Sequence, residues 1–213
     1  MTNQFQIQDE HEANVFRIVA GLPREGVIAF ALACCLRLLS VYNRASEDQS
    51  WRNLEQLNSI LGSLRLGLIN EVPFPKHVEH DLDSVLPDNP NYASDYAAID
   101  TVACIEMLLD MTDSLNAFSN KGVQLATEIA KANFNIIADI VYSATGLPMS
   151  SSNNSIVLKH DLVIAERLMQ NNDLEILSTR CDSQSIEQVL SLNQRYDITE
   201  KGWFINSDCA TKK

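Results

Sequence analysis

Residues 27–39, VIAFALACCLRLL, are apolar around almost the whole circumference of a helix, and Arg37 is the one charged side chain among them. A helix that is apolar on every side is covered by other elements on every side. We therefore expect residues 24–44 to form a central helix. The uninterrupted apolar run, residues 27–36, is too short to cross a bilayer and ends at Arg37.

The rest of the chain reads as helices that would surround this one. Leucines at positions 54, 57, 61, 64 and 68 recur every three or four residues and form one apolar stripe. Only 7 Gly and 6 Pro interrupt 213 residues, which favours long helices over many short strands. The predicted helices span residues 10–20, 24–44, 50–70, 95–118, 123–144, 156–177 and 185–192, with a short helical turn at 77–86.

Three features of the connections complete this prediction. Asn120 and Gly122 indicate a turn, Gly146 followed by Pro148 indicates a helix end, and the Ser/Asn-rich residues 149–155 indicate a loop. The predicted fold is an all-α, single-domain helical bundle or array of about six to eight helices over residues 1–205, followed by a frayed tail at 206–213.

Composition restricts the classes of partner. The net charge of −12 disfavours nucleic acid and anionic membrane surfaces, which both attract basic proteins. The polar, acidic first residues do not resemble a signal peptide, and the five cysteines show no CxxC spacing. We expect a cytoplasmic protein with reduced thiols and no cofactor.

Asp100 is the most informative polar residue. On a helical wheel it lies about 120° from Glu106, which shares a polar strip with Asp110 and Asp113. Its own wheel neighbours are Tyr96, Ala103, Cys104, Met107 and Met111. We expect Asp100, Tyr96 and Arg37 to form a buried polar anchor, because a buried carboxylate needs a partner. A functional interpretation of Asp100, as a ligand-binding or acid–base group in a cavity, stays open at this point.

Two histidines, His77 and His80, share one helix face and have acidic neighbours, so they are weak candidates for metal ligands. A metal site would need a third ligand from elsewhere, such as His160 or His11. A solvated acidic helix explains the same pattern.

An acidic segment runs from His77 to Asn120 without a single Lys or Arg. It can be a solvated surface or a docking face for a basic partner. Its nine acids include five that we assign to an acidic face: Glu79, Asp81, Asp83, Asp88 and Asp95.

The sequence lacks the motifs that would predict an enzyme with nucleophilic or phosphate chemistry. The chain contains no GxSxG motif and no Gly-rich phosphate loop. No catalytic residue is predicted.

Three segments carry a family resemblance: Phe30-x4-Cys35-x-Arg37-x4-Tyr42, Leu82-x4-Pro87 followed by Tyr96-Ala97-Ala98-Ile99-Asp100, and Asp173-Leu174-Glu175-Ile176-Leu177. In this order they resemble the YjaG-like family of bacterial proteins (domain of unknown function 416). The family's Tyr-Gly-Val-Tyr-Pro reads Ala93-Ser94-Asp95-Tyr96-Ala97 here, so the chain resembles a divergent member. The resemblance implies an all-α fold and assigns no activity or catalytic residue.

Two functions from different classes follow. The first is a non-enzymatic protein-interaction module with a basic protein partner, for example an immunity-type inhibitor that neutralises a toxin. The alternative is a small-molecule-binding protein or enzyme with a cavity near Asp100 and Arg37.

Overall fold

The structure, a computed structural model, describes residues 4–49, 54–70, 72–74, 82–86, 93–113, 120–147 and 151–196. This part of the chain is all-α, as predicted. Its elements are α1 (Gln4–Val19), α2 (Arg24–Gln49), α3 (Leu54–Asn70), the 3-10 helix η2 (Asp83–Val85), α4 (Ala93–Asp113), α5 (Asn120–Thr145), α6 (Ser151–Val157), α7 (Asp161–Thr179) and α8 (Ser183–Gln194).

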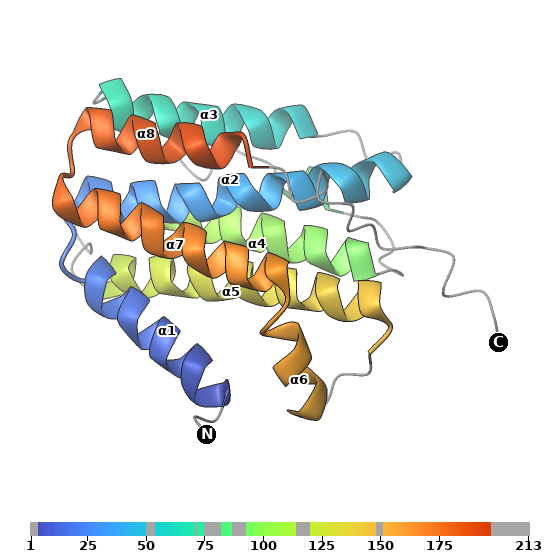
Figure 1. Ribbon diagram of the computed structural model, residues 1–213. Coiled ribbons are helices and arrows are strands. Elements are labelled where there is room, and N and C mark those ends of the chain that lie inside the picture. The colour runs from blue at the N-terminus through green and yellow to red at the C-terminus, as the bar shows by residue number, and fades with distance from the viewer. Residues whose placement is uncertain are drawn as a thin grey trace.

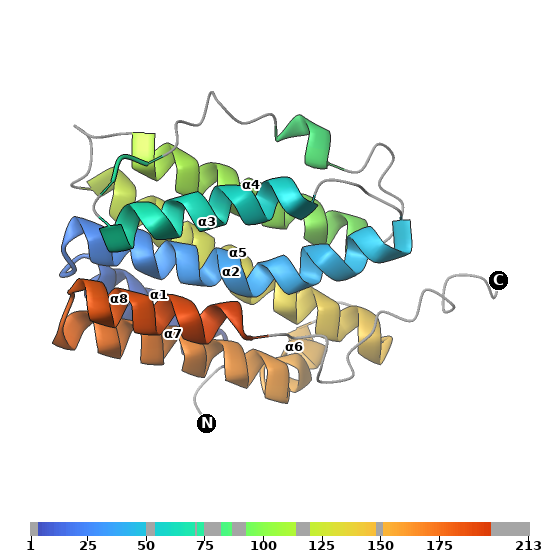
Figure 2. The same cartoon turned by 90° about the horizontal axis from the view of Figure 1, so that it is seen from above.

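Helix α2 is central, as its composition predicts. It contacts α3, α4, α5, α7 and α8, and every side chain from Val27 to Leu38 is buried. Figures 1 and 2 show α3 and α8 over one side of α2 and α4 and α5 on the opposite side, with α7 alongside α8. Helix α1 packs obliquely on α5 and α7, and α6 packs on α5 (Figure 1).

Residues 24–45 also have the length and hydropathy of a membrane-spanning helix. In the most apolar window of this segment, 83% of the residues are buried inside the protein. The apolar composition of α2 is therefore that of a core helix, and a core helix can have the same length and hydropathy as a membrane span.

The leucine stripe of α3 faces the core as predicted. Leu57, Leu61, Leu64 and Leu68 are all buried, and Leu54 packs against the core at its edge. The stripe is the contact surface of α3 because one apolar face is the part of an amphipathic helix that packing can bury.

Two predicted connections are wrong. Asn120 and Gly122 lie inside the first turn of α5, and Gly122 is buried there. The Ser/Asn-rich stretch forms the short helix α6 from Ser151, since Ser and Asn are favoured near helix N-termini.

The predicted helix over residues 156–177 is interrupted. His160 has an extended backbone, and its Nδ1 accepts a hydrogen bond from the Leu162 N–H at 3.2 Å. This N-cap starts α7 at Asp161 and separates it from α6.

Other boundary predictions agree more closely. Gly146, at φ +64°, follows the end of α5 as a C′ glycine. A helical turn was predicted for residues 77–86, and the structure has the 3-10 helix η2 within the described residues 82–86. The predicted tail at 206–213 lies outside the described residues.

Candidate functional site

The most polar part of the core surrounds Arg37 of α2, which is 1% exposed. Its Nε donates to both carboxylate oxygens of Glu166 at 2.9 and 3.1 Å, and its Nη1 donates to Asp173 at 2.7 Å and to the side-chain oxygen of Asn193. Its Nη2 donates to Glu166 at 2.9 Å and to the Cys34 sulfur at 3.2 Å. Every nitrogen of the guanidinium is therefore engaged by α7, α8 or α2 itself.

The acceptors of this network are themselves held in place. The Asn193 amide donates to the second oxygen of Asp173 at 3.0 Å and to the Val189 carbonyl at 2.7 Å. Both carboxylates, like Asn193, are fully buried. We call the set Arg37, Glu166, Asp173 and Asn193 the Arg37 network, and it ties α2 to α7 and α8.

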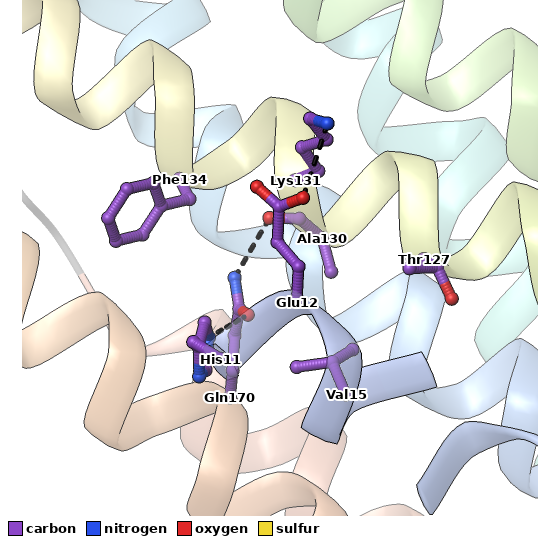
Figure 3. A pocket seen from close by; sticks show the side chains of 8 residues that line it. All are labelled: His11, Glu12, Val15, Thr127, Ala130, Lys131, Phe134 and Gln170. Carbon is purple, nitrogen blue, oxygen red and sulfur yellow. Dashed lines mark hydrogen bonds and ion pairs between the residues drawn. The ribbon is translucent and has the colours of Figure 1, made fainter. Parts of the chain in front are cut away.

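Gln170 connects the Arg37 network to α1 and α5. Its amide nitrogen donates to Glu166 at 2.9 Å and to the Ala130 carbonyl at 3.0 Å, and its oxygen lies 3.0 Å from His11 Nε2. Figure 3 shows His11 and Gln170 meeting between α1 and α7. The chain of polar contacts therefore runs from a partly exposed histidine to a buried arginine.

A small cavity lies at this outer end of the network. It has a volume of about 10 Å³, and the side chains around it in Figure 3 include the Glu12–Lys131 ion pair at 3.2 Å. A space of this size accommodates about one water molecule. It is too small for a substrate or cofactor.

Burial and charge act in opposite directions on the Arg37 network. Burial raises the pKa of Glu166 and of Asp173, and the positive charge of Arg37 lowers both in part. Burial alone would lower the pKa of Arg37, but the charge of Glu166 together with Cys34 and Asp173 raises it above its usual range. The guanidinium is therefore charged at every physiological pH.

Asp100 and Tyr96 do not form the predicted buried anchor with Arg37. Both side chains are exposed, Tyr96 by 56%, and Arg37 bonds to Glu166 and Asp173 instead. The wheel separated Asp100 from Asp110, but both side chains are exposed in the structure. Of the predicted neighbours of Asp100, Tyr96 is exposed and Ala103 and Met107 are partly exposed, whereas Cys104 and Met111 are buried. Helices α2 and α5 cover the other side of α4, where Ala98, Val102, Ile105 and Leu109 are buried.

The predicted acidic face is also wrong at Asp95, which is 2% exposed. Asp95 lies in the first turn of α4, where the helix dipole favours a carboxylate. Glu79, Asp81 and Asp88 lie outside the described residues, and of Asp83 only the backbone, in η2, is described.

The histidines considered as metal ligands are not brought together where they are described. His11 bonds to Gln170 and His160 caps α7, while His77 and His80 lie outside the described residues. Within the described ranges, no three His, Cys, Asp or Glu side chains are placed to hold a metal ion.

The described cysteines are poor nucleophiles. Cys34, Cys35 and Cys104 are fully buried, and burial raises the pKa of all three, that of Cys104 to about 12. Cys181 is partly exposed, and burial still raises its pKa. A thiol must ionise to attack, so the raised pKa values disfavour attack by these groups at neutral pH.

Two larger cavities open at the surface. One, of about 510 Å³, lies where the N-termini of α2 and α8 approach the end of α3, beside Arg24, Phe74 and Cys181. The other, of about 380 Å³, lies between α5 and α6. Neither is lined by Asp100, Arg37 or Tyr96.

Sequence reasoning missed Glu166 and Asp173 as partners of Arg37, and Gln170 as the residue that bonds to Glu166. A signal was present, because these three polar residues follow a spacing of four and three and share one face of α7 with Leu162, Val163, Leu174 and Leu177. Three polar side chains on an apolar face predict a buried polar group on the neighbouring helix.

Comparisons with known proteins agree with this fold. The family described as "Protein of unknown function (DUF416)" matches residues 14–202. A crystal structure of a DUF416 family protein from Shewanella baltica OS155 is similar at a TM-score of 0.72 and 22% identity, covering 88% of this chain and 94% of that one. At this identity the likeness shows the fold alone. No curated protein matches the chain.

Proposed function

The chain belongs to the DUF416 family, whose description names no function, and we propose that it is a non-enzymatic interaction module that binds a basic protein. The observation that carries the proposal is the outer face of α4, which we define as Tyr96, Asp100, Glu106 and Asp110. Tyr96, Asp100 and Asp110 are exposed and Glu106 is partly exposed.

The charge around this face supports a basic partner. The segment from His77 to Asn120 has nine acids and no Lys or Arg, so α4 carries no basic residue of its own. An acidic surface accelerates encounters with a positively charged surface and disfavours encounters with acidic ones. Tyr96 adds an exposed aromatic ring, a residue type that is enriched in protein interfaces.

The interior supports a binding role over catalysis. The most strongly coupled ionisable groups, those of the Arg37 network, are fully buried and bond to one another. Groups that perform acid–base chemistry must reach a substrate. The Arg37 network is instead placed to hold α2, α7 and α8 together.

The alternative function requires one cavity that reaches both Asp100 and Arg37, and these two side chains do not face a common cavity. Arg37 points toward α7 and α8, while Asp100 lies on the outer face of α4. A ligand-binding role therefore needs a different cavity.

Charge reversal on the outer face of α4 tests the proposal. We compare immobilised wild type with the double variant Asp100→Lys/Asp110→Lys and with Glu175→Lys, which reverses an exposed acid on α7. Wild type and the control variant are expected to retain a basic protein from a lysate of the source cells, and the double variant is expected to lose it. Retention should also fall between about 0.1 and 1 M salt, as the Debye length shrinks from about 10 to 3 Å.

The proposal fails if the double variant captures the same proteins as wild type. An immunity-type inhibitor is one concrete form of this function. In that form, the captured partner should arrest growth when expressed alone, and co-expression of this chain should restore growth.

A further inference from the structure

The cavity between α5 and α6 has the size of a small binding site. Its volume of about 380 Å³ lies within the range of about 300–1,000 Å³ that is usual for such sites. It is lined by Phe134, Asn135, Ala138, Asp139 and Tyr142 of α5 and by Asn154, Val157 and Leu158 of α6 and the following turn. Each wall therefore combines apolar side chains with polar ones.

The polar lining of this cavity includes one carboxylate, a tyrosine hydroxyl and two asparagine amides. Asp139 contributes an exposed carboxylate, and the Tyr142 hydroxyl already donates its proton to the Asn154 side-chain oxygen. The rings of Phe134 and Tyr142 are largely buried in the wall. A carboxylate beside aromatic rings suits a ligand with a charged donor head and an apolar stem.

The charges that raise the pKa of Asp139 and of Tyr142 are both negative. Burial and the neighbouring charge of Asp100 raise the pKa of Asp139. Burial and the charge of Asp139 raise the pKa of Tyr142. Asp139 belongs to α5, which packs on α4, and a cation bound beside it would reduce the repulsion between Asp139 and Asp100.

We propose that the cavity between α5 and α6 binds the guanidinium or ammonium group of a basic side chain on the partner protein. Asp139 would pair with the cationic head, the Tyr142 ring would contact its face, and Val157 and Leu158 would pack on the methylene stem. This inference rests on the proposed function and deepens it, because it names the group that the partner inserts beside the acidic face.

Titration calorimetry with defined probes tests the proposal. The probes are a short arginine-rich peptide, the same peptide with citrulline in place of arginine, and arginine blocked at both ends. The proteins are wild type, Asp139→Asn, Ala138→Leu and the control Glu175→Gln, with thermal melts to confirm folding. Asp139→Asn removes the charge at constant shape, and Ala138→Leu fills the cavity.

The arginine peptide is expected to bind wild type and Glu175→Gln equally. It should bind Asp139→Asn and Ala138→Leu at least about tenfold more weakly than it binds wild type. The neutral citrulline peptide should bind wild type no more tightly than the arginine peptide binds these two variants. Equal binding of the peptide by wild type and Asp139→Asn, or equal binding of the citrulline peptide, overturns the proposal. Binding of blocked arginine without binding of the peptide overturns the assignment to a protein side chain.

The two proposals can fail separately. If protein capture requires Asp100 and Asp110 but is unaffected by Asp139→Asn and Ala138→Leu, the cavity assignment is wrong and the interaction function stands. If the arginine peptide binds through Asp139 while no captured protein depends on the outer face of α4, the proposed function is wrong and the site on α5 and α6 stands.

Discussion

Replacement of Arg37 by methionine is the sharpest test of the Arg37 network. Methionine keeps an unbranched, flexible side chain but removes all the donors, so Glu166 and Asp173 lose the cation that bonds to both. Breaking a buried ion pair by removing one partner costs about 3–5 kcal/mol, because a charge stays buried without compensation. In a chain of 213 residues this corresponds to a drop in melting temperature of about 6–20 °C.

The matched control is Arg65→Met. Arg65 of α3 pairs with Glu187 of α8, but both side chains are partly solvent-accessible. A pair of this kind contributes about 1 kcal/mol or less. The same substitution should therefore cost several times more free energy of unfolding in the core than at the surface.

The pH dependence separates charge from cavity formation. Burial already raises the pKa of Glu166 and Asp173, and loss of Arg37 removes the charge that lowers them. Groups whose pKa is raised by folding bind protons in the native state at a higher pH than in the unfolded state. Acidification therefore neutralises the buried carboxylates and removes part of the free-energy penalty of burying their charge. The penalty of Arg37→Met, measured by urea unfolding followed by circular dichroism, should be smaller at pH 5 than at pH 7.

Adding Glu166→Gln and Asp173→Asn to Arg37→Met should restore part of the stability, because the buried charges are then gone. A loss below about 1 kcal/mol for Arg37→Met would refute the buried-pair argument. A loss that is identical at both pH values would show that packing, and not charge, is responsible.

Two further stability predictions follow from local geometry. Gly67→Ala places its Cβ at 2.6 Å from the Phe74 ring and should destabilise the protein by about 1–3 kcal/mol in urea unfolding. The Cβ of Gly62→Ala meets no atom within 4 Å, so this substitution should stabilise the protein by about 0.5–1 kcal/mol. Equal effects at the two sites would refute the predicted contact with Phe74. Burial lowers the pKa of His11 below 6.5, against the hydrogen bond to Gln170, so its stabilising effect is complete above pH 6.5 and is lost as the pH falls through the lowered value. His11→Gln should therefore flatten the stability profile just below pH 6.5, and an unchanged slope would show that His11 does not control it.

The fold could be predicted from particular segments. The residues around Arg37 are apolar on all sides, so they required a central helix, and the leucine stripe at residues 54–68 defined the packed face of α3. Helix boundaries were less predictable in polar segments, because the same residue types are common in loops and at helix N-termini. The segment from Ser151 became a helix, and His160 became a cap.

The polar sites show where sequence reasoning reaches its limit. The sequence by itself determined that Arg37 would be buried and would need a carboxylate, because no apolar helix can leave a guanidinium without partners. Only the tertiary structure decided that the carboxylates come from Glu166 and Asp173 and that Asp100 faces outward. Helical periodicity determines which residues share a strip, but the neighbouring helices determine which strip they cover.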